Sequence, residues 1–325
     1  MAASTSSSIL RRALLYVPSS SQKMLTKSLS LTCDNITYDL EDAVAPSKKQ
    51  EARESLRSHL LYQARPASIG ELAVRINAIS TPHALDDLLA MADLPRVDTI
   101  VIPKVNSASD LSFVTDVLRQ TAPERYSSSS SSATVGQPIK LIALVETARS
   151  VMDLRSICAS SPYLNGLIFA AEDFALDLSL TRTPSLKEFL YARSAVATAA
   201  RAFNLPSTID LVCTSYQGDE GLKRLEEECQ NGKEMGFNGK QCIHPGQVDI
   251  VQRMFGPSEA EVEWAVRVTI SDDKAAKAGR GAWTFQGKMI DAPVSGKARA
   301  IVAKAEKCGF DIQAMLEKWK NEEPE

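Results

Sequence analysis

The sequence KLIALVET, residues 140–147, is a short apolar run that ends in an acidic residue, Glu146, and this pattern recurs along the chain. Seven similar runs lie elsewhere in the chain. Each is short enough for a strand and most are rich in Val, Ile and Leu, as in parallel strands that are buried on both faces. The eight runs are Ala13–Val17, Asn35–Asp39, Glu71–Ile76, Thr99–Pro103, Lys140–Val145, Gly166–Ala170, Ser207–Val212 and Gly239–Ile243.

Segments in which apolar residues recur at helical spacing lie between these runs. The clearest are Ser47–Tyr62, Ala84–Asp93, Ala108–Leu118, Ser185–Phe203 and Asp219–Met235. Repeated alternation of strand and helix predicts an α/β fold, the (β/α)8 TIM barrel. In such a barrel the active site lies at the C-terminal ends of the strands.

Polar and charged residues follow most of the predicted strands, and acids dominate among them. A barrel gathers all strand ends on one rim, so side chains distant in sequence should meet there. Several carboxylates at close quarters repel one another unless a cation neutralises them, and an all-oxygen ligand set favours Mg²⁺ or a similar hard ion. We therefore expect metal-assisted chemistry from the strand-end residues Asp39, Glu41, Asp42, Arg75, Asn77, Lys104, Glu146, Glu172, Asp173, Asp210 and His244.

Length and composition limit the possible functions. With 325 residues the chain can form a full barrel and still have about 70 residues left over. A net charge of −3 gives no electrostatic footprint for nucleic acid, and no stretch approaches the ~20 apolar residues of a membrane-spanning helix. The six cysteines include no Cys-x-x-Cys pair, which favours reduced thiols in a soluble intracellular protein.

The two ends of the chain differ from the barrel in pattern. Residues 1–10 are predicted to be a flexible N-terminus, Ser-rich and free of acids, and Arg11 and Arg12 follow. That composition suits a mitochondrial presequence, yet the first strand begins so soon that little room remains for cleavage. The sequence leaves a mitochondrial and a cytoplasmic location open.

The barrel is expected to cover residues 11–255, with a flexible Ser-rich loop at 127–138, and a helical extension to cover 256–325. In the extension Ser258 and Glu261 form a capping-box pattern before a helix over 259–270. A final helix is predicted over 294–318. The extension is too small to build its own core, so we expect it to pack on its own barrel or on a neighbouring subunit.

Eight motifs together resemble the citrate lyase beta subunit family of metal-dependent aldolases and lyases, and they span nearly the whole chain. They are RALLYVP (12–18), YDLEDAV (38–44), KQEAR (49–53), VRIN (74–77), IPKV (102–105), LVET (144–147), AEDF (171–174) and GKQCIHP (239–245). The stretch GAWTFQGKMID, 281–291, is similar to the C-terminal segment of stand-alone members of the citramalyl-CoA lyase type. Ser19 stands where the family usually has glycine, which removes backbone freedom from the first loop.

The resemblance implies roles for particular residues. Glu146 and Asp173 match the magnesium ligands, and Arg75 matches the arginine that holds the substrate carboxylate or carbonyl. Asp291 matches the catalytic carboxylate that exchanges a proton with the acetyl-CoA methyl group. The family is described as trimeric with exchanged tails, which implies a homotrimer in which Asp291 serves a neighbour's barrel.

The resemblance also implies a coenzyme A site. Lys23 and Lys27 match CoA-contacting positions, as do Tyr16 and the pair Gln241 and Cys242. The two lysines are four residues apart and so lie on one helix face; the alternative is an ordinary solvated face. For Asp39, Glu41 and Asp42 we expect orientation of Arg75 and of metal-bound water, with a helix N-cap as the alternative.

Three functions remain open at this point. The first is cleavage of (3S)-citramalyl-CoA to acetyl-CoA and pyruvate, with malate or methylmalate synthesis as a possible side activity. The second is a CoA-independent metal aldolase on hydroxy-keto acids, in which Lys23 and Lys27 would be idle. The third is a citrate lyase beta subunit that works in a complex. For His244 the alternative to a site role is a histidine satisfied at the barrel end.

Overall fold

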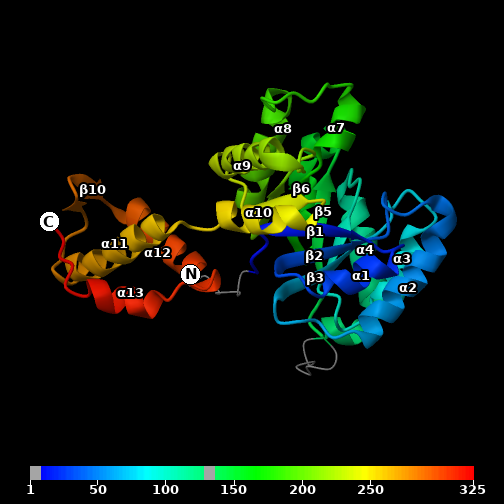
Figure 1. The fold of residues 1–325 in the computed structure, drawn as a ribbon, viewed down its shortest axis with the longest axis horizontal. Coiled ribbons are helices and arrows are strands. Elements are labelled where there is room, and N and C mark those ends of the chain that lie inside the picture. Colours follow the sequence, from blue (N-terminus) through cyan, green and yellow to red (C-terminus); the bar gives the residue numbers. More distant parts are fainter. Residues whose placement is uncertain (1–8, 128–135) are drawn as a thin grey trace. The chain divides into compact units, whose positions relative to one another are not determined.

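The computed structural model describes residues 9–127 and 136–325 (Figure 1). Residues 1–8 of the predicted flexible N-terminus and 128–135 of the predicted Ser-rich loop lie outside the described residues. The chain divides into two compact units, with the boundary between Gln252 and Arg253. Each unit is described by itself.

The first unit is a closed barrel of eight parallel strands in sequential order, which confirms the predicted TIM barrel. β1 pairs with β8 as well as β2, and this closes the sheet. Three strands begin two residues earlier than the apolar pattern predicts, and several end one or two residues earlier. The strands are β1 (Ala13–Pro18), β2 (Cys33–Asp39), β3 (Ile69–Arg75), β4 (Thr99–Ile102), β5 (Lys140–Val145), β6 (Leu164–Phe169), β7 (Ser207–Asp210) and β8 (Gly239–Cys242).

Helices surround the strands in the first unit (Figure 1). Their apolar faces pack on the outside of the barrel, and short 3-10 turns precede α2, α8 and α10. The helices are α1 (Gln22–Ser28), α2 (Lys49–Tyr62), α3 (Ala84–Met91), α4 (Ala108–Thr121), α5 (Ala148–Met152), α6 (Leu154–Ala159), α7 (Ala171–Leu178), α8 (Leu190–Ala202), α9 (Gly218–Glu234) and α10 (Val248–Phe255).

Side chains fill the barrel interior, so it is a core and not a channel. One buried apolar cluster comprises Leu14, Ala73, Val101, Ile142, Leu144, Ile168 and Ile209. Toward the strand N-termini, Arg11 donates to both carboxylate oxygens of the buried Glu71, at 2.6 and 2.7 Å. Asn35 and Thr99 also donate to Glu71, so this buried charge pair is fully hydrogen-bonded. These polar residues close the end opposite the predicted active site.

The second unit has a core of its own, which corrects the expectation that it would need the barrel for one. It contains α11 (Glu259–Lys277), the hairpin β9 (Trp283–Phe285) and β10 (Lys288–Ile290), α12 (Ala292–Lys307) and α13 (Ile312–Trp319). Two buried clusters hold it together, one around Trp283 and Phe285 and one around Val262 and Ile312. The hairpin contributes two aromatic side chains, Trp283 and Phe285, to the first of these clusters.

The single final helix predicted over 294–318 is wrong, because the chain forms two helices there. Gly309 has a φ of +89°, which ends α12 and reverses the chain before α13. The capping box at the start of α11 is confirmed: Ser258 accepts from the Glu261 backbone N–H, and the Glu261 carboxylate accepts from Ser258. Across the described ranges, no helix combines the length and the apolar character needed to cross a bilayer.

Candidate active site

A cavity of about 430 Å³ lies at the C-terminal ends of the barrel strands. Its walls come from strand ends that are far apart in the sequence, as expected for a barrel rim. Among its lining residues are eight that the sequence predicted for the site, together with Pro18 and Ile243. We call this cavity the carboxylate cavity. The eight predicted residues are Tyr16, Asp39, Asp42, Arg75, Glu146, Glu172, Asp173 and Gln241.

Arg75, the last residue of β3, is held in one orientation by Asp39 at the end of β2. Its Nε and Nη2 donate to the two Asp39 carboxylate oxygens at 2.8 and 2.7 Å. Nη1 lies 3.1 Å from Glu41 Oε2, and the guanidinium lies 4.6 Å from the centre of the Tyr16 ring. Burial acts to lower the pKa of Arg75, but bonding to Asp39 outweighs it and holds that pKa well above its usual value.

Asp39 also shapes the loop that follows it. Its carboxylate accepts from the backbone N–H groups of Glu41 at 2.9 Å and of Ala43 at 3.0 Å. Burial alone would raise the pKa of Asp39, yet the bonds from Arg75 and from these N–H groups lower it. The predicted contact with Arg75 and a turn-capping role are therefore both present, although the capped segment is a turn and not the start of a helix.

Glu146 follows β5 directly and is only 2 % exposed. The chain turns after it because Thr147 caps α5, accepting from the Ser150 backbone N–H at 3.1 Å. Glu146 Oε2 accepts from the Lys104 backbone N–H at 3.2 Å. Burial, with the negative charges of Glu41 and Asp173, raises the pKa of Glu146 to about 8. Burial thus disfavours the charged form of Glu146 most, and the two neighbouring carboxylates add to that effect.

Asp173 lies in the first turn of α7, where the helix dipole favours a negative charge. Its Oδ1 lies 3.7 Å from Lys104 Nζ. The neighbouring Glu172 also lines the cavity, but its carboxylate pairs with Arg182. The structure therefore brings Glu146 and Asp173 to the same cavity, as the sequence predicted.

The raised pKa of Glu146 leads to a prediction for the metal-free protein. In the unfolded chain Glu146 releases its proton near its usual pKa of 4.5, whereas in the folded chain it does so near 8. The stabilisation from binding this proton is complete below pH 4.5 and is lost as the pH rises to about 8. Glu146→Gln does not titrate. In EDTA the melting temperature of Glu146→Gln should therefore be at least about 3 °C above that of wild type at pH 9. At pH 4.5 the two melting temperatures should be nearly equal.

This prediction is checked by thermal unfolding followed by circular dichroism at pH 4.5, 7 and 9. Glu51→Gln removes an exposed carboxylate paired with Lys48 and serves as a control. If the difference in melting temperature between Glu146→Gln and wild type does not increase with pH, Glu146 ionises normally in the folded chain.

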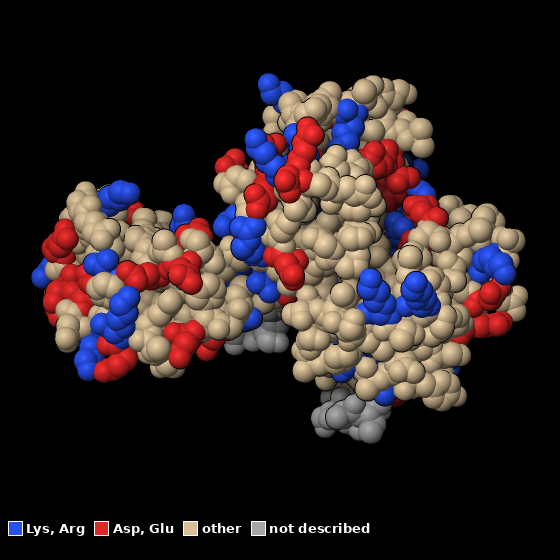
Figure 2. Space-filling model, viewed as in Figure 1, with Lys and Arg blue, Asp and Glu red and all other residues tan. Residues whose placement is uncertain are grey.

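A second cavity, of about 370 Å³, adjoins the carboxylate cavity, because Tyr16, Pro18 and Ile243 line both. Lys23 and Lys27 of α1 line its cationic side, and neither is paired with a carboxylate in the described part of the chain. Figure 2 shows blue, cationic side chains over α1 in a mostly uncharged area. We call this second cavity the lysine cavity. Its apolar lining includes Leu15, Val17, Met24 and Leu31.

The remaining CoA-matching residues differ in their placement. Gln241 donates to the carbonyls of Phe169 and Asp210 at 3.0 and 3.2 Å and accepts from the Tyr16 hydroxyl at 3.0 Å. Cys242, the next residue of β8, is fully buried and lines neither cavity. Because successive strand side chains alternate in direction, the Gln241 side chain contributes to the site while the Cys242 thiol points elsewhere.

Two of the strand-end residues have contacts that a structural role explains, although His244 also lines the lysine cavity. Asp210 is fully buried and accepts from Arg193 Nε at 3.0 Å and Nη2 at 2.6 Å. His244 Nδ1 accepts from the Gly246 backbone N–H at 3.1 Å, and its ring stacks on Tyr216 with centroids 4.9 Å apart. The satisfied-histidine alternative for His244 agrees with these contacts.

Lys104, in contrast, has contacts that the sequence did not anticipate. It was predicted only as a strand-end residue, yet its ammonium lies 3.1 Å from Glu41 Oε1 and its backbone faces Glu146. One feature of the sequence points to Lys104, which is its position directly after Ile102-Pro103 at the end of an apolar run. That position could not show where a flexible side chain would turn.

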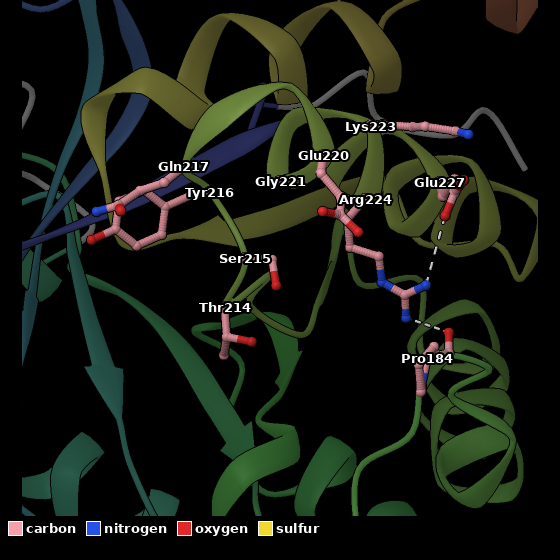
Figure 3. A pocket seen from close by; sticks show the side chains of 10 residues that line it. All are labelled: Pro184, Thr214, Ser215, Tyr216, Gln217, Glu220, Gly221, Lys223, Arg224 and Glu227. Carbon is pink, nitrogen blue, oxygen red and sulfur yellow. Dashed lines mark hydrogen bonds and ion pairs between the residues drawn. The ribbon is translucent and has the colours of Figure 1, made fainter.

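A third cavity, of about 680 Å³, is larger than the carboxylate cavity and the lysine cavity (Figure 3). It shares no lining residue with the other two cavities. Its one arginine, Arg224, is already bound to the Pro184 carbonyl and lies 3.6 Å from Glu227 Oε2. Its lining, mostly polar residues with Glu220 and Glu227, offers no excess positive charge for an anionic ligand. We therefore place the candidate site in the two joined cavities.

Asp291 belongs to the second unit, where it is the N-cap of α12. Its Oδ1 accepts from the Val294 backbone N–H at 3.2 Å. This contact is local and explains why an aspartate suits the position structurally. Its catalytic role remains a prediction.

Comparison with known proteins places these observations in a family. Residues 12–245 match the family model described as HpcH/HpaI aldolase/citrate lyase. The chain is 34% identical over 308 residues to mitochondrial citramalyl-CoA lyase of Homo sapiens, covering 91% of this chain and 86% of that protein. It is 31% identical over 302 residues to citrate lyase subunit beta of Leuconostoc mesenteroides subsp. cremoris, covering 91% and 93%.

A solved structure is similar in both fold and sequence. It is the protein CitE from Mycobacterium tuberculosis in complex with magnesium, acetoacetate and coenzyme A. The match has a TM-score of 0.69 and 29% identity, and it covers 90% of this chain and 97% of that one.

Proposed function

The chain belongs to the HpcH/HpaI aldolase/citrate lyase family, and from that premise we propose that it is a magnesium-dependent carbon–carbon lyase acting on a CoA thioester. Its proposed reaction is cleavage of (3S)-citramalyl-CoA to acetyl-CoA and pyruvate. The observation that carries the proposal is the junction of two cavities at Tyr16, Pro18 and Ile243. One is acidic and suits a metal with a small keto acid, and the other is cationic and suits the phosphates of a CoA thioester.

The donor chemistry fits a hard divalent ion. Glu146 and Asp173 supply carboxylate oxygens, and the pKa of Glu146 is raised mainly by burial and further by the negative charges of Glu41 and Asp173, which a bound cation would offset. In the described residues no group of three or more His, Cys, Asp or Glu is placed to hold a metal ion, so the proposal rests on these two carboxylates. Mg²⁺ usually takes one or two protein carboxylates and keeps oxygen ligands from water or substrate. When bound, Mg²⁺ would acidify the substrate hydroxyl and stabilise the charge that develops on its oxygen.

Arg75 is suited to hold the carboxylate of the keto-acid half. It lines the cavity, is permanently charged, and is fixed by Asp39 and by the Tyr16 ring. A guanidinium fixed in this way needs little rearrangement when the substrate binds. Asp39 therefore acts through Arg75 as a positioning residue, and Glu41 and Asp42 extend that contact at 3.1 and 3.7 Å.

The cleavage breaks the bond between C2 and C3 of the acyl chain. The tertiary hydroxyl loses its proton to water and becomes the keto group of pyruvate, while the bonding electrons move into the thioester as an enolate. The enolate carbon then takes a proton and becomes the methyl group of acetyl-CoA. We assign that proton to Asp291. A homotrimer with exchanged second units, as the family resemblance implies, would let Asp291 serve a neighbour's barrel.

The lysine cavity would hold the CoA portion. Lys23 and Lys27 offer two unpaired ammonium groups for phosphate, and the apolar lining between them and Tyr16 suits the pantetheine arm. Gln241 fixes the Tyr16 hydroxyl at the junction of the cavities. This arrangement favours a CoA thioester over the free hydroxy-keto acid that a CoA-independent aldolase would use.

Lys23→Ala should raise KM for the CoA thioester about tenfold with little change in kcat, and Lys23→Ala/Lys27→Ala should raise it further. The reason is that both ammonium groups contribute to binding and neither approaches the reacting carbons. Steady-state kinetics with citramalyl-CoA measure this. Lys48→Ala, which removes an exposed lysine paired with Glu51, should have wild-type KM. An unchanged KM in the double variant would favour the CoA-independent aldolase.

The similarity to citrate lyase subunit beta keeps the third hypothesis in view, a subunit that works only in a complex. The intact set of Glu146, Asp173 and Arg75 in one cavity favours a working catalytic site. Pyruvate release by the purified chain alone would distinguish a stand-alone enzyme from a complex-dependent one.

A further inference from the structure

Lys104 is placed against the carboxylate cavity by an unusual backbone conformation. It follows β4 and has a φ of +52°, in the left-handed region that residues other than glycine rarely adopt. Its backbone N–H donates to Glu146 Oε2 at 3.2 Å, and the Asn106 amide donates to its carbonyl oxygen at 3.1 Å. The main chain at Lys104 is therefore tied to one of the two proposed metal ligands.

The side chain of Lys104 reaches the other proposed ligand. Its Nζ lies 3.7 Å from Asp173 Oδ1, 3.1 Å from Glu41 Oε1 and 3.9 Å from Asp42 Oδ1. The side chain is 38% exposed, so the ammonium lies at the border between the acidic cluster and solvent. One residue thus contacts both Glu146 and Asp173, the first through its backbone and the second through its charge.

Among the described residues, the other cations near this cluster contact neither Asp173 nor Glu146 directly, although Arg75 lies 3.1 Å from Glu41 Oε2 and 3.7 Å from Asp42 Oδ2. Arg75 is bound to Asp39 through two hydrogen bonds. Lys49 Nζ donates to the backbone carbonyls of Leu40 and Glu41 at 2.8 and 2.7 Å. In the part of the chain that the structure describes, Lys104 is the one cation that pairs with Asp173.

We propose, on the premise of the proposed function, that Lys104 is an internal counter-ion of the metal site. In the metal-free protein Lys104 holds together the end of β5, which Glu146 follows, and the start of α7, which carries Asp173. When a divalent cation binds these two carboxylates, it does so beside the Lys104 ammonium, and the repulsion of like charges weakens its binding. Lys104 therefore sets the affinity of the site for metal and keeps the metal exchangeable.

Mg²⁺ binding measured by isothermal titration calorimetry, without any substrate, tests this proposal. Lys104→Met removes the charge and keeps the length of the side chain, and Lys104→Gln is measured beside it as a second uncharged variant. Both should bind Mg²⁺ roughly tenfold more tightly than wild type, or more. Lys104→Arg keeps the charge and should stay within about threefold of wild type.

The controls separate this effect from a general change in charge or folding. Lys48→Met removes one exposed lysine that pairs with Glu51, and it should bind Mg²⁺ as wild type does. Circular dichroism confirms folding, and without metal the two uncharged variants should melt below wild type because the acidic cluster has lost a counter-ion.

The outcomes distinguish this inference from the proposed function on which it rests. If wild type binds Mg²⁺ and the folded Lys104→Met and Lys104→Gln variants bind it equally or more weakly, the counter-ion role is overturned and the metal site stands. If neither wild type nor any variant binds Mg²⁺, the metal part of the proposed function is overturned, and the counter-ion role with it.

Discussion

Glu146→Gln is expected to lower kcat/KM for metal-dependent cleavage by roughly a thousandfold or more. The amide has almost the size of the carboxylate and can still accept from the Lys104 backbone N–H, so the local structure should persist. What the variant lacks is the negative charge that a hard cation requires. The loss should therefore fall on metal binding and chemistry, and not on folding.

Two measurements separate these effects for Glu146. Calorimetry with Mg²⁺ should show weaker binding by Glu146→Gln than by wild type, and circular dichroism should show a native fold. Glu146→Asp keeps the charge on a shorter side chain and should retain more activity than Glu146→Gln. Glu51→Gln, an exposed carboxylate paired with Lys48, is the control for the loss of one charge. Near-normal turnover by Glu146→Gln would place the metal on other residues.

Asp291→Asn is expected to lower kcat by about a hundredfold or more, which is the usual contribution of a positioned proton donor. Asparagine caps a helix as well as aspartate does, so the bond to the Val294 backbone N–H should survive and α12 should keep its start. The variant changes proton transfer without removing a structural contact. Its affinity for Mg²⁺ should stay close to that of wild type, because Asp291 is not a proposed ligand.

The second unit offers a matched control for Asp291. Asp311 is the N-cap of α13 and accepts from the Ala314 backbone N–H at 2.9 Å, so Asp311→Asn makes the same change at the next helix. Steady-state assays should find Asp311→Asn fully active. Full activity in Asp291→Asn as well would reduce Asp291 to the helix cap that its local contact shows.

The barrel was predictable because its strands are apolar runs bounded by polar residues, as in residues 140–147. Burial on both faces requires such runs, and parallel strands place their ends on one rim. The same rule predicts that Arg75, Glu146 and Asp173 lie near one another, and all three line one cavity. The assignment of Lys23 and Lys27 to a CoA site needed the family resemblance, because a pair of helix lysines alone is most often a solvated face.

Other features depend on tertiary contacts that a linear pattern does not carry. Lys104 has a left-handed backbone conformation, and its backbone contacts Glu146 and Asn106. The core of the second unit depends on the aromatic side chains of a short hairpin, Trp283 and Phe285, which has no helical periodicity. Likewise Cys242 follows Gln241 in the matched motif, but the alternation of strand side chains separates their environments.

The most direct test of the proposed activity is pyruvate release from citramalyl-CoA by the purified chain in Mg²⁺, with and without excess EDTA. Free citramalate in place of the thioester tests the need for CoA. We expect pyruvate from the thioester in Mg²⁺, little or none in EDTA, and little or none from the free acid. A folded protein that releases no pyruvate from citramalyl-CoA, or that releases it equally in EDTA, would overturn the proposed activity.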